Sequence, residues 1–212
     1  MSYDLYVITD EEIAGGLTHE EITERAIAGG ADAIQLRDKH CRYGELARTA
    51  DRICHLCKKT GTIFIVNDRL DVALACGADG VHLGQDDMGV DVARQLAPPA
   101  FIIGVSVGNA EEAIRAEQQG ASYVALSPTF STGSKNDAGP GHGLNVLWAI
   151  HASVSIPVVA IGGITTDNVG DVIAAGADGI AVISAVVGKR DIAAAARELK
   201  TLIMQARQVR HS

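Results

Sequence analysis

The chain has 212 residues, and 18 Lys and Arg against 26 Asp and Glu give it a formal net charge of −8 and a pI near 5.3. This acidic balance argues against a general nucleic-acid binder, because affinity for the phosphate backbone depends on basic surface. With 47% hydrophobic and 21% charged residues, the composition is that of an ordinary globular protein and excludes disordered and fibrous classes.

Short β-branched runs recur along the chain, and each is followed by a segment rich in Ala, Glu and Arg. This alternation is typical of βα units around a parallel sheet. Several runs are apolar on successive residues, as expected for strands that are covered on both faces. The predicted strands, in chain order, are Asp4–Ile8, Asp32–Leu36, Thr62–Val66, Gly80–Leu83, Phe101–Val105, Tyr123–Leu126, Pro157–Ile161 and Gly179–Ile183.

A short repeat supports this division into eight units. A Gly-Ala-Asp or Gly-Ala-Ser triplet stands directly before the second, fourth, sixth and eighth strands. The Gly suits a left-handed helix C-cap, after which the chain turns into the barrel. The four triplets are Gly30-Ala31-Asp32, Gly77-Ala78-Asp79, Gly120-Ala121-Ser122 and Gly176-Ala177-Asp178.

Helix start signals agree with the division into eight βα units. Thr18 and Glu21 form a capping-box pair, and Asn109 and Glu112 open the helix after the fifth strand. Eight βα units predict an α/β fold, a single (β/α)₈ TIM barrel over residues 1–212. An open doubly wound sheet is the alternative, and its dinucleotide-binding form is disfavoured because no Gly-x-Gly-x-x-Gly motif follows the first strand.

The longest apolar stretches are too short to span a bilayer, which takes roughly 18–20 residues, and no signal peptide is visible. We therefore expect a cytoplasmic protein that acts on small molecules, with no membrane or nucleic-acid partner. The oligomeric state is left open, with a homo-oligomer as one alternative.

In a (β/α)₈ barrel the active site is built where the strands end, so the polar residues that follow each run carry the functional information. The second strand ends in Gln35–Lys39, and alternation puts Gln35, Arg37 and Lys39 on one side of the chain. Two cations beside an amide indicate an anion site. A solvated charged turn is an equal alternative for this segment alone.

Carboxylates follow the next two strands. Asn67 and Asp68 come after the third strand, and Asp86 and Asp87 come after the fourth. Oxygen ligands at neighbouring strand ends, close to a cationic patch, suit Mg²⁺ held by one or two carboxylates together with substrate phosphates. Helix N-caps are the competing interpretation, because Asp68 and Asp87 both precede predicted helices.

A long loop, residues 127–143, follows the sixth strand and carries Thr132, Ser134, Lys135 and several glycines. Loops of this length are usually functional, and this content suits a lid over phosphate, with a disordered insertion as the alternative. We interpret His142 as a loop residue without a fixed role. His82, inside the fourth strand, is interpreted as a core histidine with satisfied hydrogen bonds.

The last two strands end in glycine and serine. Gly162 and Gly163 follow the seventh strand, and Ile183 and Ser184 close the eighth. Backbone N–H groups in these two loops bind phosphate in many such barrels, and glycine allows close approach. This pattern indicates a phosphate-binding barrel without naming the substrate.

Eight stretches in order along the chain match the motifs of one family. They are Tyr6–Asp10, Gln35–Lys39, Val66–Asp68, Val81–Asp87, Gly104–Ser106, Thr132–Lys135, Ala160–Ile164 and Val182–Ser184. In these stretches the chain resembles thiamine phosphate synthase over essentially its full length. The resemblance implies a transferase of thiamine biosynthesis that uses Mg²⁺. It would join 4-amino-2-methyl-5-(diphosphooxymethyl)pyrimidine to 4-methyl-5-(2-phosphoethyl)thiazole, giving thiamine phosphate and diphosphate by way of a pyrimidine methylene cation.

The resemblance also implies a role for each matching position. The pyrimidine diphosphate would be bound by Gln35, Leu36, Arg37, Asp38, Lys39, Asn67, Ser106 and Lys135. The thiazole phosphate would be bound by Thr132, Gly133, Ser134, Gly163, Ile183 and Ser184. Asp68 and Asp87 would hold the metal. The catalytic groups would be Arg37, Lys39 and Lys135, which face the charge that develops on the leaving diphosphate.

Two departures from the family pattern keep alternatives open. The sixth loop begins with Ser127-Pro128 where the family usually has Gly-Pro, and Ser134 replaces a Thr but keeps its hydroxyl. Thiazole tautomerase relatives share the barrel and often have a similar Ser-Pro pair, but their catalytic His would fall at Gly108. A non-catalytic phosphate-ligand sensor is the other alternative. The retained metal and diphosphate positions favour the synthase.

Overall fold

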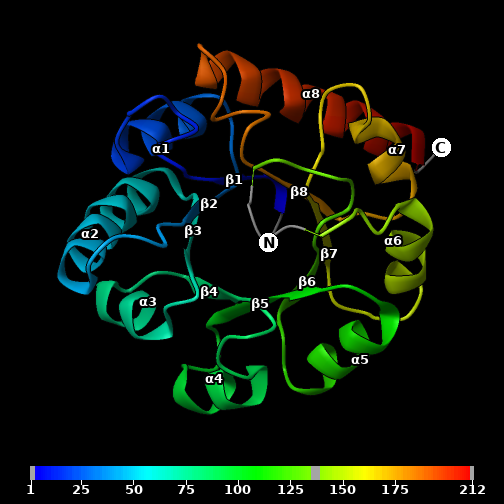
Figure 1. The fold of residues 1–212 in the computed structure, drawn as a ribbon, viewed down its shortest axis with the longest axis horizontal. Helices are drawn as coiled ribbons and strands as arrows, with labels where there is room; N and C mark the ends of the chain where they lie inside the picture. The colour runs from blue at the N-terminus through cyan, green and yellow to red at the C-terminus, as the bar shows by residue number, and fades with distance from the viewer. Residues whose placement is uncertain (1–2, 135–138, 211–212) are drawn as a thin grey trace.

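The computed structural model describes residues 3–134 and 139–210, which form a closed barrel of eight parallel strands ringed by helices (Figure 1). Strands and helices alternate along the chain, and each strand pairs with its sequence neighbours until β8 closes on β1. The strands are β1 (Tyr3–Ile8), β2 (Ala33–Leu36), β3 (Ile63–Asn67), β4 (Gly80–Leu83), β5 (Ile102–Val107), β6 (Tyr123–Leu126), β7 (Val158–Ile161) and β8 (Gly179–Val182). The helices are α1 (His19–Ala28), α2 (Tyr43–Thr60), α3 (Leu70–Cys76), α4 (Val90–Leu96), α5 (Ala110–Gln118), α6 (Leu144–His151), α7 (Val169–Ala174) and α8 (Ile192–Arg210).

The (β/α)₈ prediction is confirmed, and the strand bounds agree closely with the predicted runs. The largest difference is at the end of β5, predicted at Val105 and found at Val107. The open doubly wound alternative is wrong, because β1 pairs in parallel with β8, with Val7 beside Val182. Among the described residues, no helix combines the length and the apolar character that a membrane span requires.

The buried side chains form two layers, as the alternation of a strand between its two faces requires. An outer layer between strands and helices contains Leu5 and Val7 of β1. A smaller layer fills the barrel interior and contains the intervening Tyr6 and Ile8 together with Tyr123 of β6. The interior is therefore a packed core, and the space for a ligand lies at the end of the barrel.

The third residue of each predicted triplet ties the foot of one strand to the next. Its side chain accepts a hydrogen bond of 2.8–3.0 Å from a backbone N–H of the preceding strand, and its own N–H donates to the carbonyl of that same residue. The pairs are Asp32 with Leu5, Asp79 with Phe64, Ser122 with Ile103 and Asp178 with Val158. The glycines of the four triplets all have positive φ, between 67° and 111°, as the predicted left-handed turn requires.

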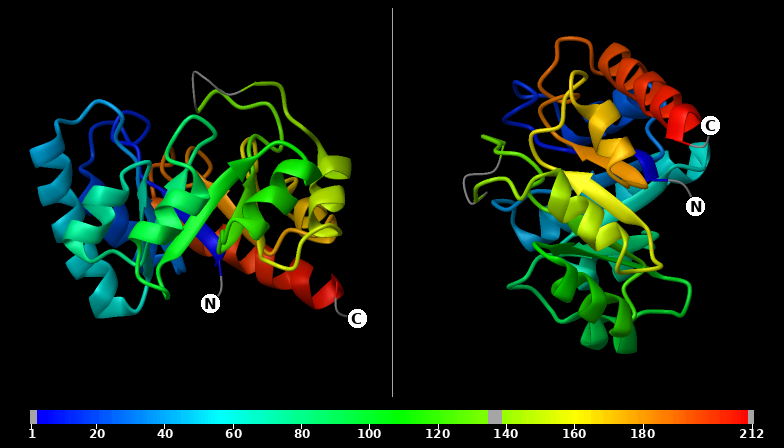
Figure 2. Two further views of the ribbon diagram at one scale, coloured as in Figure 1. Left: turned by 90° about the horizontal axis from the view of Figure 1, so that it is seen from below. Right: turned by 90° about the vertical axis from the view of Figure 1, so that its right-hand side faces the viewer.

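Both predicted helix starts are confirmed. In the capping box of α1, Thr18 Oγ1 accepts a 3.2 Å hydrogen bond from the Glu21 N–H, and the Glu21 carboxylate accepts a 2.9 Å hydrogen bond from the Thr18 N–H. The Asn109 side chain accepts a 2.9 Å hydrogen bond from the Glu112 N–H at the start of α5. Figure 2 shows that β1 begins and α8 ends at one end of the barrel, whereas the loop after β6 rises at the opposite end. That opposite end is the mouth formed by the carboxyl ends of the strands.

Candidate active site

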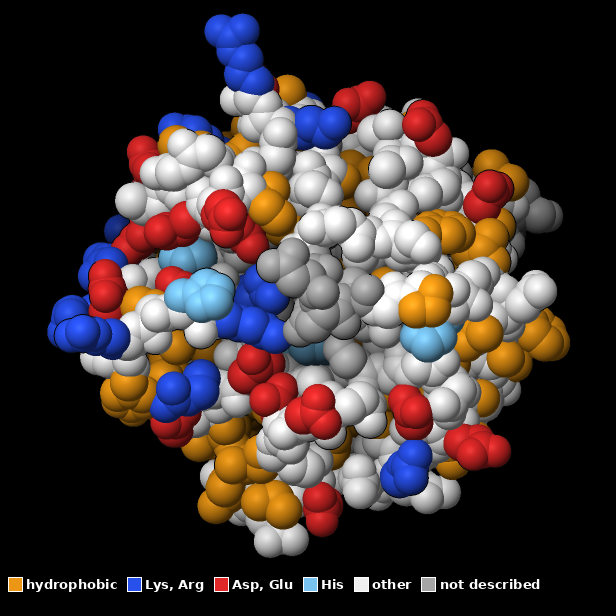
Figure 3. Space-filling model, in the orientation of Figure 1, with side chains coloured by type: hydrophobic (Ala, Val, Ile, Leu, Met, Phe, Trp, Pro, Cys, Tyr) orange, Lys and Arg blue, Asp and Glu red, His pale blue; other side chains and the backbone are white. Residues whose placement is uncertain are grey.

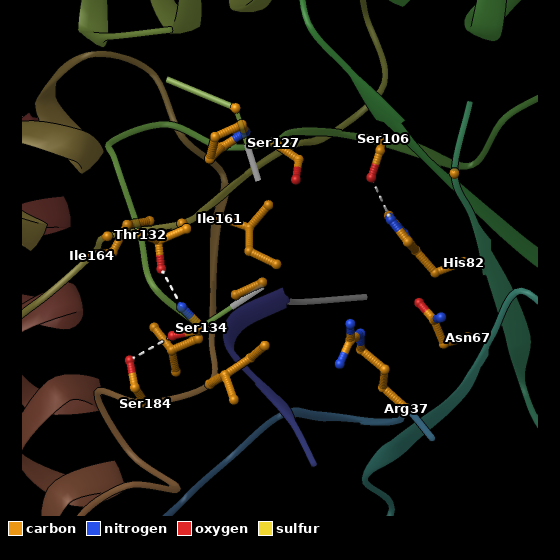
Figure 4. Close-up of a pocket in the computed structure, with 18 of the residues that line it drawn as sticks. Arg37, Asn67, His82, Ser106, Ser127, Thr132, Ser134, Ile161, Ile164 and Ser184 are labelled. Atoms are coloured by element: carbon orange, nitrogen blue, oxygen red, sulfur yellow. Dashed lines mark hydrogen bonds between the residues drawn. The ribbon is translucent and has the colours of Figure 1, made fainter. Parts of the chain in front are cut away.

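A pocket of about 320 Å³ lies at the barrel mouth, and most of the residues predicted from the strand ends line it (Figure 4). These are Arg37, Lys39, Asn67, Asp68, Asp87, Ser106, Thr132, Ser134, Gly163, Ile183 and Ser184. Four predicted residues do not line the pocket, namely Gln35, Leu36, Asp38 and Gly133. The predicted Lys135 lies outside the described residues.

The cationic side of the pocket comes from the end of β2. Arg37 is mostly buried and its Nη1 lies 3.5 Å from Oδ2 of Asp10, which follows β1. In the view down the barrel axis, basic side chains lie directly beside acidic ones near the centre of the mouth (Figure 3). A buried guanidinium held by one carboxylate keeps further N–H donors for an anion. The pocket end of β2 is therefore suited to bind phosphate oxygens.

Two predicted residues of this segment face away from the pocket. Leu36 is buried in the outer core layer between strands and helices. The Asp38 carboxylate instead shapes its own turn, accepting 2.9 Å hydrogen bonds from the N–H groups of His40 and Cys41. Burial raises the pKa of Asp38, but these hydrogen bonds and the nearby His19 outweigh burial and hold that pKa below its usual value. Side-chain contact with a ligand from Leu36 or Asp38 would need a different local conformation.

His19 supports this loop, a role that no sequence motif indicates. The residue is 4% exposed, its Nδ1 lies 2.7 Å from Thr9 Oγ1, and its Nε2 lies 3.5 Å from an Asp38 oxygen. The same Thr9 hydroxyl oxygen accepts a 3.4 Å hydrogen bond from the Arg37 N–H. His19 thus fastens the end of β2 to the end of β1. A single helix-start histidine carries no pattern from which this contact could be found.

Asp68 and Asp87 form a close carboxylate pair. Burial, together with the Asp87 carboxylate beside it, raises the pKa of Asp68 to about 6, against the opposing effect of Lys39 and Arg37. Asp68 has a φ of 62°, and the Arg69 N–H donates a 2.7 Å hydrogen bond to the Asn67 carbonyl, which closes a three-residue turn around it. A non-glycine residue held in this conformation is typical of a functional position.

The N-cap interpretation of these two carboxylates is wrong. The N-caps of α3 and α4 are Arg69 and Gly89, and neither helix has a side-chain cap hydrogen bond. Asp87 Oδ2 instead accepts a 2.6 Å hydrogen bond from the Gly84 N–H within its own loop. Both carboxylates line the pocket rather than a helix end.

The carboxylate pair fits a Mg²⁺ ion by its chemistry. Two adjacent anionic oxygen donors repel each other, and a divalent cation between them would relieve that repulsion. Within residues 3–134 and 139–210, no cluster of three or more His, Cys, Asp or Glu side chains is present that could hold a metal on its own. A pair of carboxylates suits Mg²⁺, which keeps several ligand positions for water and substrate phosphates.

The opposite side of the pocket is made by three loops that pack closely together. Gly162 and Gly163 have φ values of 97° and 64°, and a Cβ at Gly163 would lie 2.7 Å from the Ser131 carbonyl oxygen. Ser134 Oγ donates a 2.9 Å hydrogen bond to Ser184 Oγ, which joins the loop after β6 to the loop after β8 (Figure 4). The described residues that line this side of the pocket offer hydroxyls and backbone groups, and none of them is a carboxylate.

His82 has a larger part in the site than a core histidine would. Its ring is buried and hydrogen-bonded, as predicted, with Nδ1 2.9 Å from the Tyr123 hydroxyl. Its Nε2, however, lies 3.0 Å from Ser106 Oγ, and both residues line the pocket (Figure 4). His142 is exposed, as expected of a loop residue, and its ring covers Gly108, where an added Cβ would lie 3.1 Å from Cε1.

Comparison with known proteins gives a consistent result. The family model described as "Thiamine monophosphate synthase" matches residues 5–186. A thiamine-phosphate synthase of Methanoregula boonei is 65% identical, covering 98% of this chain and 96% of that protein, and one of Methanoculleus marisnigri is 60% identical, covering 98% of both. The solved thiamine phosphate pyrophosphorylase from Pyrococcus furiosus superposes with a TM-score of 0.89 at 44% identity, covering 96% of each chain.

Proposed function

The chain belongs to the thiamine monophosphate synthase family, and from this membership we propose that its barrel-mouth pocket joins 4-amino-2-methyl-5-(diphosphooxymethyl)pyrimidine to 4-methyl-5-(2-phosphoethyl)thiazole. The protein is a transferase that couples the pyrimidine and thiazole moieties in thiamine biosynthesis. One observation carries the choice of substrates. A carboxylate pair and two cations line one side of a single pocket, and glycine and hydroxyl loops suited to a second phosphate line the other.

The diphosphate would lie against Arg37 and Lys39, both of which line the pocket. Charge-assisted hydrogen bonds from a guanidinium to phosphate oxygens are short and strong. Because Asp10 and Thr9 hold the Arg37 segment in place before any ligand arrives, little reorganisation would be needed on binding. Asn67 and Ser106 would add neutral polar contacts. Lys135 stays a prediction from the sequence for this subsite.

Asp68 and Asp87 would hold Mg²⁺, which when bound would neutralise charge on the diphosphate as it leaves. The proposal is supported by the adjacency of the two carboxylates and by the Asp68 conformation, which no helix cap explains. The carboxylates must be ionised to bind the ion, so the raised pKa of Asp68 makes protons competitors for this site.

The thiazole phosphate would lie against the loops after β7 and β8. Gly163 allows the substrate to approach the backbone closely, and the hydroxyls of Ser134 and Ser184 lie 2.9 Å apart at this side of the pocket. A phosphate here would leave the thiazole ring directed toward the pyrimidine side.

The chemistry needs electrostatic and positioning groups more than a nucleophile. The bond between the pyrimidine methylene carbon and the diphosphate oxygen breaks, its electron pair leaves with diphosphate, and the ring amino group stabilises the resulting cation. The thiazole nitrogen then supplies the electron pair for the new carbon–nitrogen bond. Arg37 and Lys39 would stabilise the leaving group, and the loop after β6 would exclude water that could otherwise capture the cation.

Parallel assays of two reactions test this function. The purified protein is supplied with both phosphorylated substrates and Mg²⁺ in one assay and with a thiazole carboxylate phosphate alone in the other. Coupling that disappears with EDTA and returns with added Mg²⁺ is the expected result. Coupling that is undiminished by EDTA would contradict the metal assignment, and isomerisation of the thiazole without coupling would identify a tautomerase instead.

A further inference from the structure

A chain of four hydrogen bonds runs through the barrel interior beneath the pocket. Gln35 Nε2 donates to the Tyr6 hydroxyl at 2.8 Å, and the Tyr6 and Tyr123 hydroxyls lie 3.1 Å apart. The Tyr123 hydroxyl lies 2.9 Å from His82 Nδ1, and His82 Nε2 lies 3.0 Å from Ser106 Oγ. Gln35, both tyrosines and His82 are each at most 8% exposed, so water does not replace these contacts. This series of hydrogen bonds ends at Ser106, which lines the pocket.

The backbone makes room for this chain at one glycine. Gly104 of β5 pairs with His82 of β4 on one side and with Tyr123 of β6 on the other. A Cβ at Gly104 would lie 2.0 Å from Cζ of Tyr123, so any other residue there would displace the phenol ring. The His82 and Tyr123 rings stack with centroids 5.7 Å apart and an angle of 25° between planes. The arrangement is therefore built into three adjacent strands.

Counting the protons shows in which direction the hydrogen bonds from Gln35 to Ser106 run. Burial raises the pKa of both tyrosines, so each hydroxyl keeps its single proton. Because Gln35 Nε2 donates to Tyr6, the Tyr6 proton is available to Tyr123, and the Tyr123 proton is available to His82 Nδ1. The opposite order would have Tyr6 accept twice and would leave its buried proton outside the chain, which is costly. In the favoured order, His82 is neutral and its proton is on Nε2.

The direction of these hydrogen bonds decides whether the Ser106 hydroxyl is a donor or an acceptor toward the pocket. If Nε2–H donates to Ser106 Oγ, the Ser106 proton is left for the pocket. If the order were reversed, the Ser106 hydroxyl would donate to His82 and would present only lone pairs to the pocket. An anionic phosphate oxygen is attracted by the first arrangement and repelled by the second. The buried tyrosines thus affect the substrate without touching it.

We propose that Tyr6 and Tyr123 are positioning residues that hold His82 as its neutral Nε2–H tautomer and thereby present the Ser106 hydroxyl as a donor to the pyrimidine diphosphate. The Ser106 contact rests on the proposed function, whereas the tautomer of His82 does not. Tyr6 and Tyr123 do not line the pocket. Their substitution by Phe therefore tests the buried hydrogen bonds rather than a direct contact with the substrate.

The test begins with NMR of protein carrying ¹⁵N-labelled histidine, with the His82 signals assigned by their loss in His82→Asn. Pyrrole-like Nε2 and pyridine-like Nδ1 are expected in the wild type. Tyr123→Phe should release the tautomer, so that Nδ1–H becomes populated, and should lower the melting temperature because the buried Tyr6 hydroxyl loses its partner. An Nδ1–H or doubly protonated His82 in the wild-type protein would overturn the proposal, whatever the activity.

Kinetics then test the link to the substrate. Tyr123→Phe should raise the KM for the pyrimidine diphosphate by about 10-fold and leave the KM for the thiazole phosphate unchanged, as loss of one hydrogen bond to a charged group implies. Ser106→Ala should have a similar effect, and the double variant should be no worse than Ser106→Ala alone. Tyr43→Phe, at an exposed tyrosine of α2, is the matched control and should be silent. Additive effects of the two substitutions would overturn the proposed link.

Discussion

Ser134 Oγ donates a 2.9 Å hydrogen bond to Ser184 Oγ, and this contact joins the loop after β6 to the loop after β8. The two residues are fifty positions apart in the chain and meet only because the barrel brings their strand ends together. Ser134 is further held by a 3.2 Å hydrogen bond from its N–H to Thr132 Oγ1. The proposed thiazole side of the pocket is thus preformed, which lowers the entropy cost of binding there.

Ser184→Ala should remove this contact and raise the KM for the thiazole phosphate by about 5-fold, the effect of roughly 1 kcal/mol for one neutral hydrogen bond. The KM for the pyrimidine diphosphate should stay unchanged. Initial rates with each substrate varied in turn measure both values. Ser153→Ala, which removes a hydroxyl bonded to the Ile150 carbonyl away from the pocket, is the control. Equal changes in both KM values would show that the contact is structural only.

Gly163→Ala should damage the same side of the pocket. The new Cβ would lie 2.7 Å from the Ser131 carbonyl oxygen, at a backbone φ of 64° that disfavours side chains. We expect a loss of roughly 1–3 kcal/mol in the free energy of unfolding together with weaker thiazole phosphate binding. Gly170→Ala in α7 is the control because, apart from the nearby backbone of its own helix, no atom lies within 4 Å of its added Cβ. Denaturant titration of both variants checks the stability, and equal stabilities would contradict this packing.

Asp87→Asn should lower coupling activity by at least roughly 10²-fold, because it removes one proposed Mg²⁺ ligand and one source of leaving-group stabilisation. It should also lower the pKa of Asp68, since the like charge that raises it is gone. Asp51→Asn, an exposed position of α2, serves as the control. The prediction fails if the Asn variant keeps wild-type kcat at the same Mg²⁺ concentration.

The response to Mg²⁺ should depend on pH. The pKa of Asp68 is about 6, above its ordinary value of 3.8, so ionising this group costs the folded state stability as pH rises through that interval. Mg²⁺ would bind the ionised form and would relieve this cost. We therefore expect Mg²⁺ to raise the melting temperature more at pH 7.5 than at pH 5, relative to NaCl of equal ionic strength. A larger Mg²⁺ effect at the lower pH would contradict the assignment of Asp68 as a ligand.

Much of the fold could be predicted from the sequence because its signals are local. Apolar runs mark the strands, and the Gly-Ala-Asp triplets mark the turns, whose glycines have the expected positive φ. The hydrogen bonds from the Val158 N–H to the Asp178 carboxylate and at the three equivalent pairs could not be predicted, because they connect residues that approach only once the barrel closes. The triplet predicts a turn before a strand, but it does not predict which residue its third member contacts.

The residues of the candidate site also fall into those that local sequence signals predict and those that they do not. Arg37, Asp68 and Ser184 could be found because polar residues at strand ends stand out against apolar runs. His19 and the chain through Tyr123 could not, because a buried polar side chain has no periodic signature and its partners lie far away in sequence. The open choice between metal ligands and helix caps for Asp68 depended on where α3 begins, which only the three-dimensional structure provides.

The proposed coupling reaction is tested most directly by a ³¹P NMR time course on one reaction mixture that contains the protein, both phosphorylated substrates and Mg²⁺. We expect the pyrimidine diphosphate signals to disappear while free diphosphate and thiamine phosphate appear in equal amounts. Omitting either substrate should stop the formation of thiamine phosphate. A mixture in which the pyrimidine diphosphate is consumed or retained without any thiamine phosphate would contradict the proposed coupling reaction.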